Sequence, residues 1–503
     1  MFRINLKLLL LTTLFALFVS SCYGQTAALK PSGSAVVSDV NNAKVIDDYL
    51  TKIEKENNFS GSLLIVKDGK TIFKKGYGFA DKENKIPFTG STLASMGSIT
   101  KTFTATAILK LAEENKLALN DSLKKFFPEI PKDKADITIH QLLTHSSGFS
   151  EFLVDDKGDY EKLTTDEFLK RAFAQKLSFD PGTKAVYTNV GMSILAVIIE
   201  KVSGVDYEEF LRKELFAPVG IKHLSYQYPT ETSIQIANGY QNGKLWGTHQ
   251  SHFKEAGGGP YWNLKGNGGL EVSLDEMEIW INAVSQNKIL SKTMTEKMFT
   301  AHIAEDGTNG NSSFGYGCNI TRSRRNTKVV DNGGSNGIYF ARLVRLADEG
   351  IVAYMVTNES SINTNMVLPN VSQLLMNGKI DEQAMPKRKF ESPKSGLIYD
   401  LLITKGANDF EQNLKKAGIE IDDDMILLAV GQTLTNEKKI GEAIVLYEYY
   451  TKTFPNIVVA QNDLGDLYLL KGEKAKAIPC YKRALEIRPE NPRAKEALKK
   501  LGQ

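Results

Sequence analysis

The sequence is poor in cysteine and carries little excess charge of either sign. Its three cysteines, at positions 22, 318 and 480, fit neither the disulfide framework of a small secreted domain nor a zinc-binding spacing. Lysine and arginine number 62 against 59 aspartate and glutamate residues, a formal charge of +3, so the composition does not indicate a nucleic-acid partner. We therefore expect a protein without metal or cofactor, whose partner binds at a discrete site.

The rest of the composition is that of a globular protein. Hydrophobic residues make up 42% and charged residues 24% of the chain, which excludes disorder, collagen and coiled coil as the main architecture. A chain of 503 residues is long for one compact domain, since domains usually run to about 100–200 residues. We therefore expect two or three folding units.

The N-terminal segment, residues 1–24, has the form of a signal peptide. Arg3 and Lys7 precede an apolar run from Leu8 to Val19. This run is shorter than the about 20 apolar residues that a transmembrane helix needs, and no later stretch is long and apolar enough to replace it. The sequence therefore predicts export, to the periplasm or to the surface of a bacterial membrane.

Two processing sites fit this segment. The residues that end at Cys22 resemble the bacterial lipobox, in which the cysteine becomes a lipid anchor and provides the protein's one contact with a membrane. A cut after Gly24 would instead release a protein without an anchor. In both cases residues 25–42, rich in serine, alanine and valine, are expected to form a tether.

Strand-like and helix-like patterns alternate between residues 43 and 375. The strand patterns Ser62–Val66 and Lys70–Lys74 flank Asp68-Gly69, a strong hairpin turn signal, and a further strand is expected at Ile351–Val356. Helical periodicity is found at Lys101–Glu114, Met192–Val202 and Leu274–Val284. Helices between early and late strands predict an α+β domain, with an antiparallel sheet that carries a helical insertion.

A polar linker at residues 376–394 separates this domain from an all-α region at 395–503. Four positions recur after 34 residues: Gly431, Ala443, Tyr447 and Pro455 become Gly465, Ala477, Tyr481 and Pro489. The period resembles that of the tetratricopeptide repeat, and an unrelated pair of helical hairpins is the alternative. A helix at 396–417 is expected to cap the array, which would bind a protein or peptide partner.

Ser98 and Lys101 form the first candidate catalytic pair. Gly97-Ser98 opens the helical pattern, and positions three apart lie on one face of a helix, so the amine of Lys101 is expected to reach the hydroxyl of Ser98. Serine becomes a good nucleophile when a neighbouring base takes its proton, and a lysine with a lowered pKa is such a base. The helix start also offers N–H groups to developing negative charge.

Tyr187 and Asn189 form the second candidate pair. A phenol can relay a proton and an amide can hold a substrate carbonyl, and the spacing of two lets both face one side of an extended turn. Each pair is weak evidence alone, because both spacings recur elsewhere in the chain. Their occurrence in one domain makes a shared site a stronger hypothesis than either pair does alone.

Taken together, these motifs resemble the serine β-lactamase and penicillin-binding-protein family, particularly its class C-like serine hydrolases. The resemblance runs in family order from about Val45 to Asn358. It includes Gly76-Tyr77-Gly78, Leu142–Gly148, Phe179–Asn189 and Gly266–Leu270. It implies a β-lactamase/transpeptidase-like α+β domain, with a helical subdomain, followed by the all-α tetratricopeptide-like region.

The resemblance also implies a role for each candidate residue. Ser98 would be the acylated nucleophile, Lys101 its activating partner and Tyr187 the proton relay, while Asn189 would position the substrate. The oxyanion hole would be formed by the N–H of Ser98 and one from the later strand, expected at Gly334. These polar residues would alternatively form a buried network in a retained but inactive fold.

The third family motif departs from the pattern. The family has a His or Lys, any residue and then Gly on the strand beside the nucleophile, and the register predicts Asp331, with Gly333 and Gly334 completing the substrate-binding strand. An ionised Asp331 beside Lys101 would raise the pKa of the lysine and weaken it as a base. Charge complementarity would then favour neutral or amine-bearing substrates over those with a terminal carboxylate.

The sequence therefore predicts an exported serine hydrolase that transfers the acyl group of an ester, amide or peptide to Ser98. Cell-wall-derived compounds and β-lactams are among the candidate substrates. The alternative is a catalytically weak or inactive envelope protein, which binds a small-molecule or peptide ligand and recruits a protein through its repeats. Asp331 is the feature that favours this alternative.

Overall fold

The structure is a computed structural model, and the chain forms two compact units, Met1–Asp381 and Glu382–Gln503. The residues it describes are 39–57, 59–228, 234–241, 244–323, 325–360, 362–378, 393–406, 408–421 and 424–502. The predicted signal peptide at 1–24, with Cys22, and most of the linker at 376–394 lie outside these ranges. Within them, no helix is long and apolar enough to cross a membrane.

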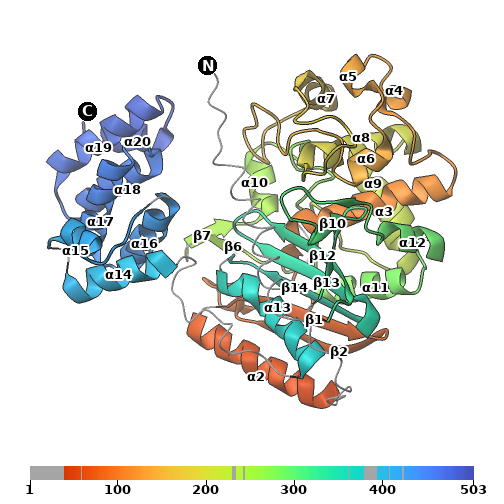
Figure 1. The fold of residues 1–503 in the computed structure, drawn as a ribbon, viewed down its shortest axis with the longest axis horizontal. Helices are drawn as coiled ribbons and strands as arrows, with labels where there is room; N and C mark the ends of the chain where they lie inside the picture. The colour runs from red at the N-terminus through yellow and green to blue at the C-terminus, as the bar shows by residue number, and fades with distance from the viewer. Residues whose placement is uncertain are drawn as a thin grey trace. The chain divides into compact units, whose positions relative to one another are not determined.

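An eight-stranded antiparallel sheet forms the centre of the first unit (Figure 1). Its order is β2-β1-β14-β13-β12-β11-β10-β9. The strands are β1 (Gly61–Lys67), β2 (Lys70–Tyr77), β9 (Ile303–Ala304), β10 (Ser312–Phe314), β11 (Asn319–Arg322), β12 (Lys328–Ser335), β13 (Phe340–Leu346) and β14 (Ile351–Thr357). The first and last strands pair in the interior, where Gly61 lies opposite Thr357 and Lys67 opposite Ile351.

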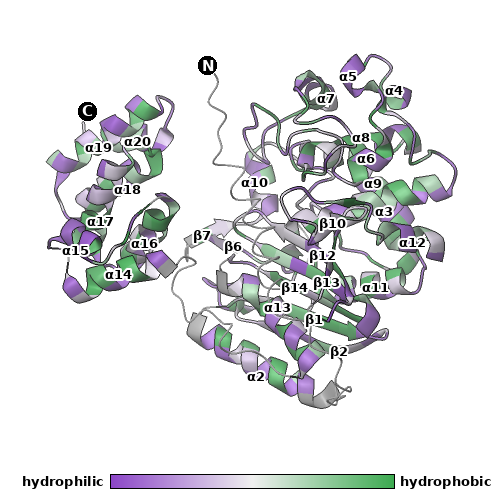
Figure 2. Ribbon diagram, in the orientation of Figure 1, coloured by the Kyte–Doolittle hydropathy of each residue, from purple (hydrophilic) through white to green (hydrophobic). Residues whose placement is uncertain are grey.

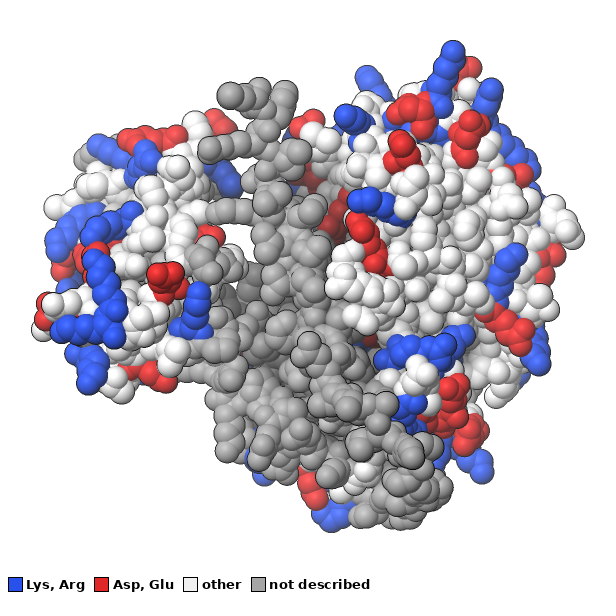
Figure 3. Space-filling view, viewed as in Figure 1, with Lys and Arg blue, Asp and Glu red and all other residues white. Residues whose placement is uncertain are grey.

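Helices cover this sheet. The helix α2 (Asp39–Asn57) packs on the edge strand β2, and α13 (Ile362–Asn377) packs on β14 and β13 and against α2. The helices α3 (Thr100–Glu113), α8 (Asn189–Ser203) and α11 (Leu274–Ser285) belong to the main core. Because β14 is buried along its whole length, its sequence is a continuous apolar run, and Figure 2 shows the central strands as hydrophobic. Basic and acidic side chains are interspersed over the face of each unit in Figure 3.

Short elements complete the first unit. The strands are β3 (Phe79–Asp81), β4 (Ile86–Pro87), β5 (Ala94–Ser95), β6 (Gly239–Gln241), β7 (Lys244–Gly247) and β8 (Glu271–Val272). The helices are η1 (Gly97–Ile99), α4 (Leu123–Phe126), α5 (Lys132–Ala135), α6 (Ile139–Leu143), α7 (Thr165–Ala174), α9 (Tyr207–Phe210), η2 (Leu211–Phe216), η3 (Ala217–Val219), α10 (His249–Glu255), α12 (Lys292–Met298) and η4 (Ala347–Glu349). Many of them belong to the segment between β2 and β9, which is the predicted helical insertion.

The predicted hairpin is present between β1 and β2. Asp68 and Gly69 form its turn with φ of 48° and 76°, left-handed values that glycine adopts freely and aspartate tolerates. The predicted strand at Ile351–Val356 and the three predicted helices are also found, within a few residues of their expected bounds. The expected tether at 25–42 is four residues too long, since α2 begins at Asp39.

Over its described residues, the regular elements of the second unit are all helices. These are α14 (Pro393–Lys405), α15 (Phe410–Lys416), α16 (Asp424–Asn436), α17 (Ile440–Thr453), α18 (Val458–Leu470), α19 (Lys474–Ile487) and α20 (Pro492–Lys500). The 34-residue period has a packing cause, because the ring of Tyr447 lies against Gly431 and that of Tyr481 against Gly465. A Cβ atom at Gly465 would lie 2.7 Å from the Tyr481 ring, so the glycine lets the two helices approach.

One expectation for the second unit is wrong. The single capping helix expected at 396–417 is two helices, α14 and α15. The first ends before Gly406, whose φ of +78° lies in the left-handed region and is typical of a glycine that terminates a helix. Both helices still contribute to the hydrophobic core of this unit.

Candidate active site

Ser98 lies in η1, the tight turn that leads directly into α3, and its side chain is partly exposed. This turn packs closely against the end of β12. A Cβ atom at Gly334 would lie 2.0 Å from the carbonyl oxygen of Met96 and 2.8 Å from the nitrogen of Ser98. A Cβ atom at Gly97 would lie 2.7 Å from the nitrogen of Ser335. The two glycines therefore let the nucleophile turn and the strand approach to backbone contact.

The amine of Lys101 lies at the centre of the site. Its Nζ donates hydrogen bonds to Ser98 Oγ at 3.1 Å, to Asn189 Oδ1 at 2.6 Å and to the backbone carbonyl of Asn267 at 2.5 Å. Burial lowers the pKa of Lys101 to about 7, although the charges of Glu151 and Asp159 act in the opposite direction. The lysine therefore exchanges its proton near neutral pH, as a general base for a serine must.

Tyr187 occupies the other side of the serine. Its hydroxyl donates to Ser98 Oγ at 2.7 Å, and its ring centroid lies 4.6 Å from Lys101 Nζ. Burial raises the pKa of Tyr187 above its usual value, so the phenol keeps its proton and stays a donor to the serine. The proton of Ser98 is therefore free to pass to an acceptor such as Lys101.

His145 and Thr188 hold Tyr187 in place. The N–H of Thr188 donates to Nδ1 of His145 at 3.1 Å, and the two rings of His145 and Tyr187 have centroids 4.9 Å apart. Burial lowers the pKa of His145 to about 3, so this ring is neutral and accepts the bond. Thr188 also caps α8, which places Asn189 at the first position of that helix and aims its amide at Lys101.

The contribution of Asn267 was missed from the sequence. It contacts Lys101 through its backbone carbonyl, which carries no residue-specific signal. Its side-chain amide donates to Ser193 Oγ at 2.9 Å and to the carbonyl of Asn263 at 2.8 Å, which fixes the peptide. The available signal was the flanking pair Gly266 and Gly269, whose φ values of 84° and 88° bend the chain around it.

Asp331 does not face the nucleophile, so its expected place in the substrate site is wrong. Arg342 Nε and Nη2 donate to its two carboxylate oxygens at 2.9 and 2.5 Å, and both residues are buried. Side chains alternate between the faces of a strand, and Gly334 is the residue that faces Ser98. Asp331 and Gly333 therefore belong to the opposite face, the one on which Arg342 lies across from Gly333.

The residue two positions before Gly334, on the face of the nucleophile, is Asn332. Its Nδ2 donates to Thr102 Oγ1 at 3.1 Å and to the carbonyl of Gly317 at 2.7 Å. Asn332 therefore contributes a neutral amide on the face of β12 that carries Gly334. Gly334 lies against the nucleophile turn as expected, and Asp331, three residues earlier on the strand, lies on the opposite face.

The structure thus brings Ser98, Lys101, Tyr187 and Asn189 together and leaves Asp331 and Gly333 on the far side of β12. Over the described ranges, no three side chains of the metal-binding types form a cluster that could hold an ion. Cys318 and Cys480 are free, buried thiols.

The nucleophile is a serine at the start of a buried helix, hydrogen-bonded to an amine and a phenol and packed against an antiparallel sheet. This is the arrangement of the β-lactamase and penicillin-binding class. Comparison with family models supports the same assignment. The β-lactamase model matches residues 46–374 and a tetratricopeptide repeat model matches residues 458–491. The chain belongs to the β-lactamase family, and the family and fold expected from its motifs are confirmed.

Known proteins of this kind are similar to long parts of the chain. Bacillus subtilis PbpX, which is named as a penicillin-binding protein, is 31% identical over 268 residues, 52% of this chain and 63% of its own length. The octameric penicillin-binding protein homologue of Pyrococcus abyssi superposes with a TM-score of 0.59 and 30% identity, over 68% of this chain and 79% of that one. A penicillin-binding protein of Bacillus halodurans superposes with a TM-score of 0.55 and 25% identity, over 65% and 99% of the two chains.

Family membership supports an enzyme of the serine hydrolase type, at the level of the family. The tetratricopeptide repeat gives the second unit a capacity for protein interaction. The chain spans about 63% of the length of PbpX, the first of these relatives.

Proposed function

We propose that this protein is a serine hydrolase that transfers the acyl group of an ester, amide or peptide to Ser98 and then to water. The observation that carries the proposal is the hydroxyl of Ser98, which lies 3.1 Å from an amine whose pKa is lowered to about 7 and 2.7 Å from a protonated phenol. Such a hydroxyl has both an acceptor for its proton and a donor for the leaving group.

The reaction follows from these contacts. Neutral Lys101 takes the proton of Ser98 as the Oγ attacks the substrate carbonyl, and the resulting oxyanion is stabilised by the N–H of Ser98 with a second N–H from β12, at Gly334 or Ser335. Tyr187 passes a proton to the departing alcohol or amine and recovers one from the lysine. Water then attacks the acyl-serine by the same route in reverse, which restores the hydroxyl of Ser98.

The substrate class extends from cell-wall peptides and β-lactams to simple esters. PbpX and the two structural relatives carry the name of penicillin-binding proteins or their homologues, which supports a peptide-like or β-lactam ligand. The neutral Asn332 supplies no positive charge for a substrate carboxylate, so esters and amides without one are favoured over β-lactams.

The test compares the wild-type protein with Ser98→Ala. The expected result is covalent labelling of the wild type by a fluorescent phosphonate, hydrolysis of p-nitrophenyl acetate, and loss of both in the variant. A fluorescent penicillin probes the β-lactam branch in the same samples. Labelling at another residue, or equal hydrolysis by the folded variant, would reject Ser98 as the nucleophile.

Asn332 also favours a second candidate function, that of a catalytically weak envelope protein which binds a ligand and recruits a protein through its repeats. Its neutral amide supplies no positive charge that could assist the proton relay from this face of β12. Reversible binding of a penicillin or peptide by a folded wild-type protein, without labelling or turnover, would favour this function over hydrolysis.

We further propose that the chain is exported through residues 1–24. The charged start and the apolar run from Leu8 to Val19 support this. Mass spectrometry of the mature protein from bacterial cells distinguishes a lipid-modified Cys22 from an unmodified N-terminus at Gln25. An intact Met1 in both the membrane and the released fractions would contradict export through this segment.

A further inference from the structure

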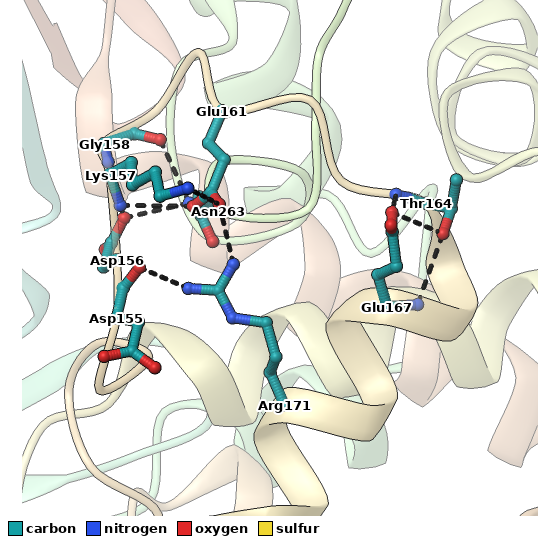
Figure 4. Close-up of polar contacts among 9 residues, drawn as sticks. All are labelled: Asp155, Asp156, Lys157, Gly158, Glu161, Thr164, Glu167, Arg171 and Asn263. Atoms are coloured by element: carbon teal, nitrogen blue, oxygen red, sulfur yellow. Dashed lines mark hydrogen bonds and ion pairs between the residues drawn. The ribbon is translucent and has the colours of Figure 1, made fainter.

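The loop of residues 155–161 is held in place by side-chain hydrogen bonds from Asn263 and Arg171 (Figure 4). Nδ2 of Asn263 donates to Asp156 Oδ1 at 2.9 Å, to the carbonyl of Gly158 at 3.0 Å and to Glu161 Oε2 at 3.1 Å. Arg171 adds a bond to Glu161 Oε1 at 2.8 Å and one to the carbonyl of Asp155 at 2.5 Å. The loop therefore has a fixed position on its scaffold.

The residue that fixes this loop also belongs to the framework of the catalytic lysine. The carbonyl of Asn263 accepts the bond from the side chain of Asn267 at 2.8 Å, and the carbonyl of Asn267 accepts the bond from Lys101 Nζ at 2.5 Å. One short chain of hydrogen bonds thus leads from the loop to Lys101.

A second connection leads from the loop to the other side of the nucleophile. The hydroxyl of Tyr160 lies 2.6 Å from Nδ1 of His249, and Nε2 of that histidine lies 3.3 Å from Nδ2 of Asn336. Asn336 directly follows Ser335, the last residue of β12. The loop is therefore anchored both to the lysine framework and to the end of the strand that packs against Ser98.

In the sequence, Asp159 stands between Gly158 and Tyr160, which make the two anchoring contacts. Its carboxylate is partly exposed and makes no hydrogen bond or ion pair to any residue in the ranges that the structure describes. Its negative charge acts on Lys101. Burial raises the pKa of Asp159 to about 6, so the group is mainly ionised at neutral pH.

Building on the hydrolase function proposed above, we propose that Asp159 binds the ammonium group of amine-bearing substrates and thereby determines the specificity of Ser98. A partly exposed carboxylate without a protein partner, on a loop linked both to the Lys101 framework and to the end of β12, is complementary to a cation. A charge-assisted hydrogen bond to an ammonium is among the stronger polar contacts. The neutral Asn332 leaves the face of β12 beside Ser98 without a competing cation at that position.

The test uses three p-nitroanilides of alanine, in both enantiomers, that differ only in the amine: free, acetylated and succinylated. At pH 7 the free amine is protonated, since α-amino groups have a pKa of about 7.7–8.0. We expect kcat/KM for the free amine to exceed that for the acetylated substrate by about tenfold or more, with the succinylated substrate slowest. Asp159→Asn should bring the first two values within about threefold of each other.

Asp155→Asn is the matched control, because it removes a carboxylate from the same loop and should keep the wild-type ratio. Comparing substrates within one variant cancels the effect that the Asp159 charge exerts on Lys101. Two results would overturn the role of Asp159 and leave the hydrolase function intact. One is that the wild type turns over the free and the acetylated anilides equally well. The other is that Asp159→Asn keeps the wild-type ratio of kcat/KM between these two substrates.

If no anilide is turned over and Ser98 is not labelled, the hydrolase function fails and binding decides the role of Asp159. Calorimetry then compares alaninamide with N-acetylalaninamide. The expected result is that the wild type binds alaninamide at least tenfold more tightly than Asp159→Asn does, while the acetylated amide binds both equally. Equal affinities of the two proteins for alaninamide would overturn the proposal.

Discussion

The amine of Lys101 lies 3.1 Å from the hydroxyl of Ser98, and the lysine side chain is removed from solvent. Burial lowers its pKa to about 7, so the fraction of neutral lysine, the form that accepts the serine proton, rises with pH. We expect kcat/KM for a neutral ester to rise through an apparent pKa near 7 and then level off. Initial rates between pH 5 and 9 measure this.

Removal of the amine should abolish that profile. Lys101→Met is expected to lower kcat/KM by about 10²–10⁴-fold, the usual range for loss of a general base. Lys110→Met, which changes a lysine further along the same helix, should keep both rate and profile. A pH profile that stays the same in Lys101→Met would show that another group titrates.

Gly334→Ala tests the contact between β12 and the nucleophile turn. The added methyl group would lie 2.0 Å from the carbonyl of Met96 and 2.8 Å from the nitrogen of Ser98, so the turn must move away from the strand. We expect kcat/KM to fall by about 10²–10³-fold, comparable to the loss of an oxyanion donor. Gly90→Ala, whose methyl group would meet its nearest neighbour at 3.5 Å, is the control and should keep activity.

Asp331→Asn should lower the stability of the protein without changing its substrate preference. The carboxylate is buried in a two-pronged ion pair with Arg342, on the face of β12 away from Ser98. Breaking such a pair typically costs about 3–5 kcal/mol of unfolding free energy. Urea unfolding followed by tryptophan fluorescence measures this, because Trp246, Trp262 and Trp280 all lie in the first unit. The ranking of anionic and neutral substrates should not change, and a changed ranking would return Asp331 to the substrate site.

Glu271→Gln should alter how stability depends on pH. The side chain of Glu271 is 0% exposed, and neither carboxylate oxygen has a hydrogen-bond partner in the part of the chain that the structure describes. Burial raises its pKa from 4.5 to about 8. Folding therefore favours the protonated form of Glu271, and this contribution to the unfolding free energy is fully present below pH 4.5. It is lost as the pH rises from 4.5 to about 8, by up to about 1.4 kcal/mol per pH unit.

The variant lacks this titration, so its unfolding free energy should increase relative to the wild type between pH 5 and 8. Urea unfolding at pH 5, 6.5 and 8 provides the comparison. Glu129→Gln, at an exposed position, should follow the wild type at each pH. A constant difference between Glu271→Gln and the wild type would mean that Glu271 is ionised in the folded protein throughout.

Gly465→Ala tests the repeat packing in the second unit. A methyl group 2.7 Å from the Tyr481 ring would separate α18 from α19, at a cost of about 1–3 kcal/mol. Hydrogen exchange should therefore accelerate in peptides from both helices, while labelling of Ser98 stays the same. Gly441→Ala, which has no neighbour within 4 Å in the described structure, is the control. Unchanged exchange would contradict the packing origin of the 34-residue period.

Local patterns predicted the parts of the site that lie on one helix or one turn. Ser98 and Lys101 are one helical turn apart, and Tyr187 and Asn189 flank the cap of α8, so each pair is fixed by nearby backbone. The hairpin at Asp68-Gly69 was predictable for the same reason, because two residues determine its turn. The family motifs then brought the distant pairs together.

Features that depend on strand facing or on backbone groups were not predictable in this way. Gly334 and Asp331 were both expected at the site, but residues three apart on a strand lie on opposite faces, and only the packing of β12 against η1 shows which face carries Ser98. The carbonyl of Asn267 has no side-chain signature, and the break at Gly406 depends on a left-handed φ that many helical glycines do not adopt.

The pairing of β1 with β14 has a consequence for how the molecule is made. Residues 61–67 (β1) are synthesised early, but their partner in the sheet, residues 351–357 (β14), is synthesised much later. The turn that carries Ser98 likewise cannot pack against Gly334 until β12 has been synthesised. Contacts between residues so distant in sequence slow folding. The hydrogen bonds between β1 and β14 therefore cannot form until most of the first unit has been synthesised. A ribosome-bound chain that stops before β12 should therefore have no functional nucleophile.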